Sequence, residues 1–362
     1  DPLRIADVAA LRSANNAELR EMGQVPFPLL WRAGGRGFER VSWPAAIERI
    51  AGDIRASSPE RLAFYMTSRG ITNETYYAAG KAARSMGIAN VDSAARICHA
   101  PSTTALKATI GVAATTCSLS DVMKTDLLVI WGANPANNQP VFMKYLYKAR
   151  MSGTRVVVIN PFLEPGLEHY WVPSTTESAL FGTKMCDLHV PVRPGGDVAF
   201  ADAALKRLIE RDAVDHAFIA EHTDHWDNVV AHLAELTYEE LLEDAGLTMA
   251  QLDAFVDEYA NASSAILLWS MGITQHKHAG AGVRGIVNLA LARGNVGRDG
   301  AGLMPIRGHS GVQGGAEMGA YATALPGGLE PNDVNASAIA KQWGFDVPAR
   351  AGLTAAEMPE AA

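Results

Sequence analysis

Residues 127–138 read LLVIWGANPANN, a continuous apolar run that passes directly into a loop of small and amide-bearing residues. An unbroken apolar run of this kind is typical of a parallel strand that is covered on both faces. Helical segments separate it from similar runs at residues 61–67, 154–159, 188–192 and 265–269. We therefore predict an α/β fold with two doubly wound, Rossmann-like αβα lobes and mostly parallel sheets.

The composition is that of a globular protein of about two domains. The chain has 362 residues, of which 48% are hydrophobic, and a formal net charge of −8, while one domain takes roughly 150 residues. The negative charge and the lack of Lys/Arg runs argue against a nucleic-acid partner. No apolar stretch reaches the roughly 20 residues that span a bilayer, so we expect no membrane span.

Cysteine use narrows the kinds of site that this chain can hold. Cys98, Cys117 and Cys186 lie far apart, and no C-x-x-C motif occurs. Such a set argues against a cysteine-ligated zinc or 4Fe-4S site within this chain. Nor does it suit a secreted protein stapled by disulfides. We therefore expect a reducing, cytoplasmic location.

The loops that follow the apolar runs share one chemistry. Their small residues let backbone N–H groups approach a ligand, and their Asn, Thr, Ser and Gln side chains offer neutral hydrogen bonds. In a parallel sheet these loops all lie at the carboxyl edge, where ligands bind. No G-x-G-x-x-G follows a strand and no G-x-x-x-x-G-K-[ST] occurs, so the pattern favours a nucleotide-like ligand outside the usual NAD and ATP sites. For any single loop, the alternative is that these residues only form a turn and bind no ligand.

Residues 95–104, ARICHAPSTT, form the sharpest local feature. We predict that Ser102 caps a helix through about Ile110, so that Cys98 and His99 precede its positive end. That placement lowers the pKa of a thiol and favours a thiolate that binds a metal or attacks an electrophile. A hydrolase-type Cys–His pair is disfavoured because adjacent residues seldom face each other. A small buried residue beside a capping histidine is the structural alternative.

Residues 305–315, PIRGHSGVQGG, place Arg307 inside a glycine-rich turn. Its planar guanidinium suits a carboxylate that accepts two parallel hydrogen bonds. A solvated charge on a surface loop is the alternative. His276 and His278 are two residues apart and so do not share a helix face, which argues against a two-histidine metal site there.

Six motifs stand in order along the chain: SRGITNE at 68–74, NVDSAARICHAPS at 90–102, LLVIWGANPANN at 127–138, ILLWSMGITQH at 266–276, GNVGRDGAG at 294–302 and PIRGHSGVQG at 305–314. Together they resemble the molybdopterin-dependent oxidoreductases of the dimethyl-sulfoxide-reductase superfamily, and most of all the formate dehydrogenase catalytic (alpha) subunit-like branch. The resemblance runs from about Val41 to Gly319. One such motif would be weak, but six in register are highly specific.

The resemblance implies a bis-molybdopterin guanine dinucleotide cofactor around one molybdenum or tungsten. It makes Cys98 the metal ligand, His99 the neighbouring proton acceptor and Arg307 the residue that orients the substrate carboxylate. A soft thiolate ligand suits this metal chemistry. The residues that match pterin or guanine contacts are Arg69, Gly132, Asn134, Asn137, Asn138, Gly195, Asp197, Trp269, Gly272, Gln275 and His309.

The resemblance also implies how the chain is divided. Residues 1–39 form an N-terminal extension, residues 40–93 plus 310–362 an incomplete first α/β lobe, and residues 94–309 a second lobe inserted in the first. The iron–sulfur cysteines of the family have no counterpart here. We therefore expect the 4Fe-4S cluster and the electron-transfer partner outside this chain, which would be a central portion of a longer protein.

The implied function is oxidation of a small-molecule substrate, formate, to CO2 by a molybdenum or tungsten enzyme. Oxo transfer to a small oxyanion such as nitrate is the alternative with the same cofactor. A non-catalytic, pterin-binding, stress-related relative is the alternative outside catalysis. Two departures bear on the cofactor contacts: Asn160-Pro161-Phe162 stands where an acidic and a basic residue are common, and His309 stands where glutamine is usual.

Overall fold

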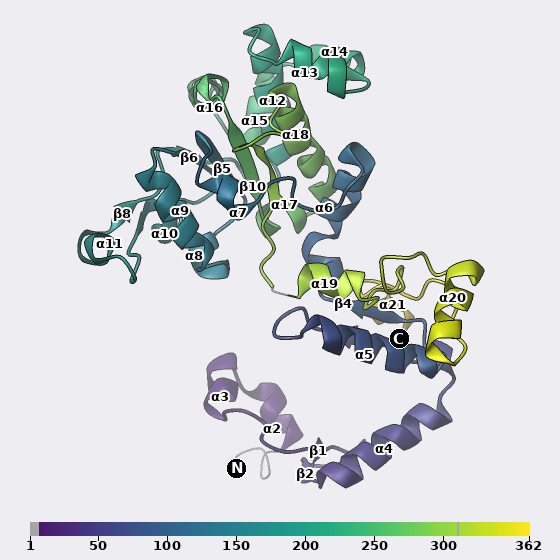
Figure 1. Cartoon of the computed structure of the whole chain (residues 1–362). Coiled ribbons are helices and arrows are strands. Elements are labelled where there is room, and N and C mark those ends of the chain that lie inside the picture. Colours follow the sequence, from purple (N-terminus) through teal and green to yellow (C-terminus); the bar gives the residue numbers. More distant parts are fainter. Residues whose placement is uncertain (1–6, 310) are drawn as a thin grey trace.

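The computed structural model describes residues 7–309 and 311–362 (Figure 1). Residues 1–6 of the predicted extension and Ser310 of the predicted first lobe lie outside the described residues. The described part of the chain begins with α2 (Val8–Ser13), α3 (Asn16–Glu21), the antiparallel strands β1 (Leu29–Leu30) and β2 (Glu39–Arg40), and α4 (Trp43–Ala56). Asn15 separates α2 from α3, because its side chain forms a reciprocal capping box with Glu18 at the start of α3.

A five-stranded parallel sheet forms the centre of the upper part of the molecule in Figure 1. Its strands are β5 (Leu127–Trp131), β6 (Arg155–Ile159), β9 (Leu188–Val190), β10 (Ala265–Trp269) and β11 (Gly302–Pro305). The strand order is β11-β10-β5-β6-β9, and every neighbouring pair is parallel. The predicted α/β class with a mostly parallel sheet is therefore confirmed.

Helices cover both faces of this sheet, as continuous apolar strands require. In β5, Leu127 and Val129 face one core, and Leu128 and Ile130 face the other. The first core packs against α6 (Ala95–Ile110), α12 (Asp197–Glu210), α16 (Met249–Asn261) and α18 (Ala279–Ala292). The second packs against α9 (Phe142–Met151) and α10 (Pro165–Glu168). Because every β5 side chain is buried, the strand carries no alternation of polar and apolar residues.

The other elements around this sheet are short. They are α7 (Leu119–Val122), α8 (Pro135–Asn138), α11 (Thr176–Phe181), α13 (His216–His222), α14 (Trp226–Glu235), α15 (Tyr238–Ala245), α17 (Met271–Thr274), and the antiparallel strands β7 (His169–Tyr170) and β8 (Thr183–Lys184). Across residues 7–309 and 311–362, no helix combines the length and the apolar character needed to cross a membrane.

The lower part of Figure 1 joins segments from both ends of the chain. It contains η1 (Pro59–Arg61), β3 (Phe64–Met66), α5 (Asn73–Ser85), β4 (Val91–Ser93), α19 (Val312–Glu317), α20 (Asp333–Trp343) and α21 (Met358–Ala361). The fully buried Arg84 on α5 donates to the carbonyls of Gly319 and Tyr321. The Asp92 carboxylate accepts from the Ala355 backbone N–H at 2.7 Å. A discontinuous first lobe needs contacts of this kind, and the division into lobes stays a prediction.

The strand order reverses between β5 and β10, since β6 and β9 lie on one side and β11 on the other. In open α/β sheets, ligands bind in the crevice between the loops that leave the carboxyl ends of the two strands at this reversal. Here the two loops touch through glycines: Gly272 N–H donates to the Gly132 carbonyl at 2.9 Å. A Cβ on Gly272 would lie 2.6 Å from Gly132 Cα, and Gly132 has a φ of 58°. Both positions therefore require glycine.

We expect Gly272→Ala to lower the free energy of unfolding by about 1–3 kcal/mol, because the added methyl group pushes the two loops apart. Gly52→Ala is the matched control, since a Cβ at this position in α4 meets nothing within 4 Å. Alanine should stabilise that helix by about 0.5–1 kcal/mol. Urea unfolding followed by circular dichroism measures both changes. A Gly272→Ala protein as stable as wild type would contradict the close contact.

Candidate active site

Cys98 and His99 lie at a kink within α6. The backbone of His99 is not helical (φ −130°, ψ 19°), and Pro101 follows without an N–H group to continue the hydrogen-bond ladder. Residues 95–110 thus form two helical pieces that meet at His99. The prediction that Ser102 caps the second piece is wrong, because Ser102 lies inside it, whereas Cys98 and His99 do precede the start of that piece, as predicted.

Cys98 is 6% exposed, and burial raises the pKa of its thiol. The Arg307 charge and the Gly308 backbone amide act in the opposite direction without outweighing burial. The low thiol pKa predicted from the helix end is therefore wrong for the protein alone, because desolvation penalises the thiolate more than these groups favour it. A thiolate at this position needs a further cation beside it.

His99 is fully buried, and its ring is held from one side. Nδ1 lies 3.1 Å from Ser102 Oγ, which also accepts from Trp269 Nε1 at 2.9 Å. Among the described residues, His99 Nε2 has no hydrogen-bond partner. Burial and the Arg307 charge lower the pKa of His99 to about 4, with the Ile306 carbonyl acting in the opposite direction. The imidazole is therefore neutral near pH 7 and has one unpaired nitrogen.

Arg307 follows β11, and the positive charge of its guanidinium acts to lower the pKa of both Cys98 and His99. It is partly buried and donates from Nη2 to the Ala113 carbonyl at 3.4 Å. Burial lowers the pKa of Arg307, whereas Tyr321 and Cys98, when ionised, act in the opposite direction. The fold thus brings Cys98, His99 and Arg307 into one electrostatic neighbourhood.

Tyr321 is a neighbour of this site that the sequence analysis missed. Arg96, two residues before Cys98, places its guanidinium 3.8 Å from the centre of the Tyr321 ring. Arg96 is itself paired with the buried Asp92 carboxylate at 3.1 Å. Burial is the main cause that raises the pKa of Tyr321, so its phenol stays protonated. No local pattern could indicate this residue, because the contact joins α6 to a loop far along the chain.

A pocket of about 440 Å³ opens at the carboxyl ends of β5, β6, β9 and β10. The predicted cofactor contacts that line it are Gly132, Gly195, Asp197, Gly272 and Gln275. Polar residues that line it without having been predicted as contacts are Asn160, Arg193 and His276. The rule that ligands bind at strand ends could have indicated Asn160 and Arg193, because they follow β6 and β9.

Asp197 is the buried carboxylate of this pocket, and it is the first residue of α12. Its Oδ1 accepts from Trp131 Nε1 at 2.8 Å, and His276 Nε2 lies 3.9 Å from Oδ2. Burial raises the pKa of Asp197, while the Trp131 hydrogen bond and His276 lower it. A carboxylate with one strong internal donor keeps acceptor capacity for N–H groups of a ligand.

The other predicted contacts lie outside this pocket. Arg69 is exposed after β3, Asn137 and Asn138 are exposed on α8, Asn134 caps α8, and Trp269 is fully buried in the core. His309 is partly buried, and its Nδ1 has no partner in the described part of the chain. The pocket therefore gathers only part of the predicted contact set.

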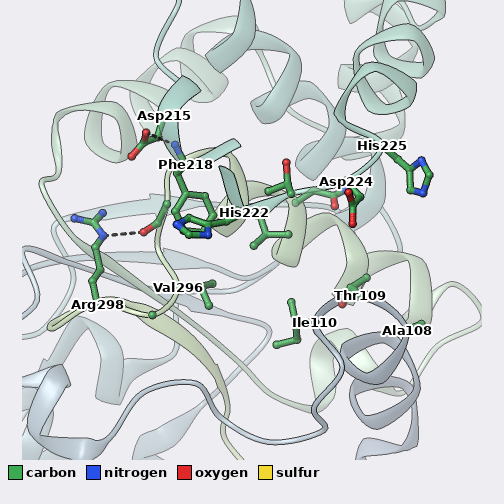
Figure 2. A pocket seen from close by; sticks show the side chains of 15 residues that line it. Ala108, Thr109, Ile110, Asp215, Phe218, His222, Asp224, His225, Val296 and Arg298 are labelled. Carbon is green, nitrogen blue, oxygen red and sulfur yellow. Dashed lines mark hydrogen bonds between the residues drawn. The ribbon is translucent and has the colours of Figure 1, made fainter. Parts of the chain in front are cut away.

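A cavity of about 990 Å³ lies at the opposite edge of the sheet, near the start of β10 (Figure 2). Figure 2 shows Phe218 and His222 side by side, with ring centroids 4.9 Å apart, and Arg298 bonded to a backbone carbonyl. Among the residues that the structure describes, no predicted site residue lines this cavity. The predicted cofactor contacts that line a cavity at all, namely Gly132, Gly195, Asp197, Gly272 and Gln275, line the smaller pocket.

We expect Trp131→Phe to lower the free energy of unfolding by about 2–4 kcal/mol at pH 7, because the Asp197 carboxylate loses its donor and the core loses volume. The folded-state pKa of Asp197 is raised, so its ionised form costs stability above that pKa. The cost is relieved as the pH falls through the folded-state pKa. The loss in Trp131→Phe should therefore shrink as the pH falls from 7 toward 4, close to the ordinary aspartate pKa.

The control for this variant is Trp343→Phe, which removes an exposed hydrogen bond to the Tyr77 hydroxyl. Its effect on unfolding should be small and the same at both pH values. Urea unfolding of both variants at pH 7 and pH 4 makes the comparison. A loss in Trp131→Phe that does not change with pH would argue against an ionised Asp197 held by the indole.

The Molybdopterin oxidoreductase family matches residues 26–362 of the chain. Protein YdeP of Escherichia coli (strain K12) is 33% identical over 325 residues, which cover 86% of this chain and 43% of that protein. Formate dehydrogenase H of the same strain is 31% identical over 342 residues, 92% of this chain and 46% of that protein. The F420-dependent formate dehydrogenase 2 subunit alpha of Methanococcus maripaludis is 32% identical over 301 residues, which cover 83% of this chain and 42% of that protein.

The chain thus spans less than half the length of these relatives. Among solved structures, acetylene hydratase from Pelobacter acetylenicus aligns with a TM-score of 0.59 over 80% of this chain and 38% of its own, at 20% identity. That likeness concerns the fold alone. The family match extends over almost all of the described residues, and the chain therefore belongs to the molybdopterin oxidoreductase family.

Proposed function

We propose that this chain is the central portion of a formate dehydrogenase-like catalytic subunit that oxidises formate to CO2. Family membership implies a metal–pterin cofactor, and we assign it as bis-molybdopterin guanine dinucleotide with molybdenum or tungsten. Two of the relatives are formate dehydrogenases by name. The observation that carries the proposal is that Arg307 lies near enough to Cys98 and His99 for its charge to act on both.

The strand-end pocket fits the nucleotide end of such a cofactor. Gly132 and Gly272 bring two loop backbones into direct contact in the lining of this pocket. A Cβ on Gly195 would meet nothing within 4 Å, which leaves the loop before α12 open. Asp197 offers a carboxylate to the N–H groups of a guanine edge. Neutral backbone donors at such a crevice suit phosphate groups.

Cys98 would hold the metal. Its thiol is almost fully buried, and a coordinated cation reverses the effect of burial because a coordinating thiol loses its proton. A soft thiolate is a fitting ligand for molybdenum or tungsten. When bound, the metal–pterin group supplies two-electron redox chemistry.

Arg307 binds the formate carboxylate through the two parallel N–H groups of its guanidinium. Conversion of formate to CO2 releases one proton and two electrons, and His99 accepts the proton at Nε2. This role requires the tautomer in which Nδ1 carries its hydrogen and donates to Ser102 Oγ. Ser102 can accept from both His99 and Trp269, because a hydroxyl oxygen has two lone pairs.

The electron acceptors lie outside this chain in the proposed scheme. A 4Fe-4S cluster in the full-length protein and a separate electron-transfer partner would take the two electrons. A cytoplasmic location stays a prediction.

In the full-length protein, Arg307→Lys keeps the positive charge but loses the planar fork. The formate KM should rise and kcat should fall, so that kcat/KM drops by about 10–100-fold at unchanged metal content. Arg284→Lys, an exposed position on α18, is the matched control and should leave both constants unchanged. Formate-dependent dye reduction measures them. Wild-type kcat/KM in Arg307→Lys would remove the basis for this assignment.

The same assay separates the alternatives. A metal-loaded wild-type protein that reduces nitrate and does not oxidise formate would be an oxo-transfer enzyme. A protein that carries pterin and turns over neither substrate would be the non-catalytic relative. Either result would overturn formate oxidation as the function.

Cys98→Ser should abolish formate oxidation, because a hard oxygen ligand replaces a soft thiolate. X-ray absorption at the metal edge of the full-length protein should show one sulfur neighbour fewer than in wild type. Cys117→Ser is the control, since Cys117 lies beside the β11 strand and contacts Leu303 instead. An unchanged sulfur count in Cys98→Ser would mean that another residue holds the metal.

A further inference from the structure

Gln139 follows α8, and both polar atoms of its side-chain amide are buried. Neither Nε2 nor Oε1 has a hydrogen-bond partner within residues 7–309 and 311–362. Burial of an unpaired amide is costly, and buried polar groups in native proteins are almost always paired. Such a group indicates a partner outside the residues that the structure describes.

Gln139 lies where the strand-end pocket meets the segment that carries Arg307. A Cβ built on Gly308 would be 3.8 Å from Gln139 Nε2 and 3.9 Å from Met271 Cε. Met271 also lines the 440 Å³ pocket. A ligand that extends from this pocket toward Arg307 would therefore pass the Gln139 amide.

The backbone of Gln139 is held at both of its polar groups. Its N–H donates to the Pro135 carbonyl at 2.9 Å, and its carbonyl accepts from the Phe142 N–H at 2.8 Å. Pro140 follows and further restricts the backbone of Gln139. The side chain is thus presented from a rigid base, as a preorganised binding group requires.

A second unpaired polar atom lies on the same segment. His309 Nδ1, next to Gly308, is also buried without a partner in the described part of the chain. Gln139 and His309 therefore place unpaired polar atoms on both sides of Gly308. A polar ligand at this segment would supply the missing partners.

The chemistry of the amide selects among ligands. Nε2 donates and Oε1 accepts, so a fitting partner must offer an acceptor and a donor side by side. A carboxylate or nitrate offers acceptors only and would leave Oε1 unpaired. The pterin and guanine rings of the cofactor both carry C=O and N–H groups along one edge and would satisfy both atoms. Since the guanine is assigned to Asp197 in the strand-end pocket, a pterin ring is left for Gln139.

We propose that Gln139 binds a pterin ring of the cofactor through this donor–acceptor pair and acts as a cofactor-positioning residue. This rests on the proposed function in one respect, namely that the full-length protein carries pterin. The resemblance to known oxidoreductases pointed to Asn137 and Asn138, its exposed neighbours, and not to Gln139.

The test uses the full-length, cofactor-loaded protein with Gln139→Leu, which removes both hydrogen-bonding atoms at similar volume. Pterin retained after dilution is measured by the fluorescence of the oxidised pterin. We expect the variant to lose pterin roughly tenfold faster than wild type. Gln342→Leu, the same change at an exposed position on α20, should retain pterin like wild type.

Thermal unfolding supplies a readout that a merely structural role would not reproduce. In the cofactor-free protein, Gln139→Leu should leave Tm unchanged or raise it, because an unpaired buried amide is removed. In the loaded protein the same variant should lower Tm, because the cofactor binds the native state more weakly. An equal fall of Tm in both forms would make Gln139 structural and overturn the proposal.

The remaining outcomes are also decisive. Wild-type pterin retention in Gln139→Leu would overturn this inference and leave the proposed function standing. A raised formate KM at unchanged pterin content would make Gln139 a substrate ligand and overturn it as well. A wild-type protein without pterin would overturn both the inference and the proposed function.

Discussion

The Gly272 N–H group donates to the Gly132 carbonyl across the point where the strand order of the sheet reverses. Two loops can approach this closely only because neither residue carries a Cβ. Their contact sets the position of the crevice at the carboxyl edge of β5 and β10. Asp197 and Gln275 lie in the pocket beside this contact, and Met271 leads from the pocket toward Gln139 and Gly308.

Desolvation governs the charges around this crevice. Burial raises the pKa of Cys98 and lowers that of His99, so both side chains are neutral in the protein alone. The Arg307 cation favours a Cys98 thiolate but does not outweigh burial. The Cys98 thiol would therefore lose its proton only if a further positive charge, such as a bound metal cation, lay beside it.

Contacts between distant parts of the chain hold the site in place. Arg84 on α5 binds backbone carbonyls of the segment that follows α19. Arg96 links the buried Asp92 to the Tyr321 ring and lies two residues before Cys98. The segment after Arg307 is thus attached both to α5 and to the helix that carries the cysteine. Movement of that segment would change the surroundings of Cys98 and Arg307 together.

Local sequence was sufficient for the α/β class and for the loops at the strand ends, because an apolar run and a glycine-rich turn each depend on neighbouring residues. The resemblance to known oxidoreductases indicated Gly132, Asp197 and Gly272, which line the pocket. The position of Tyr321, the unpaired amide of Gln139 and the net shift of the Cys98 pKa were decided only by tertiary structure. Each of them depends on burial by elements far apart in the chain, and desolvation is a property of the packed interior that no local pattern encodes.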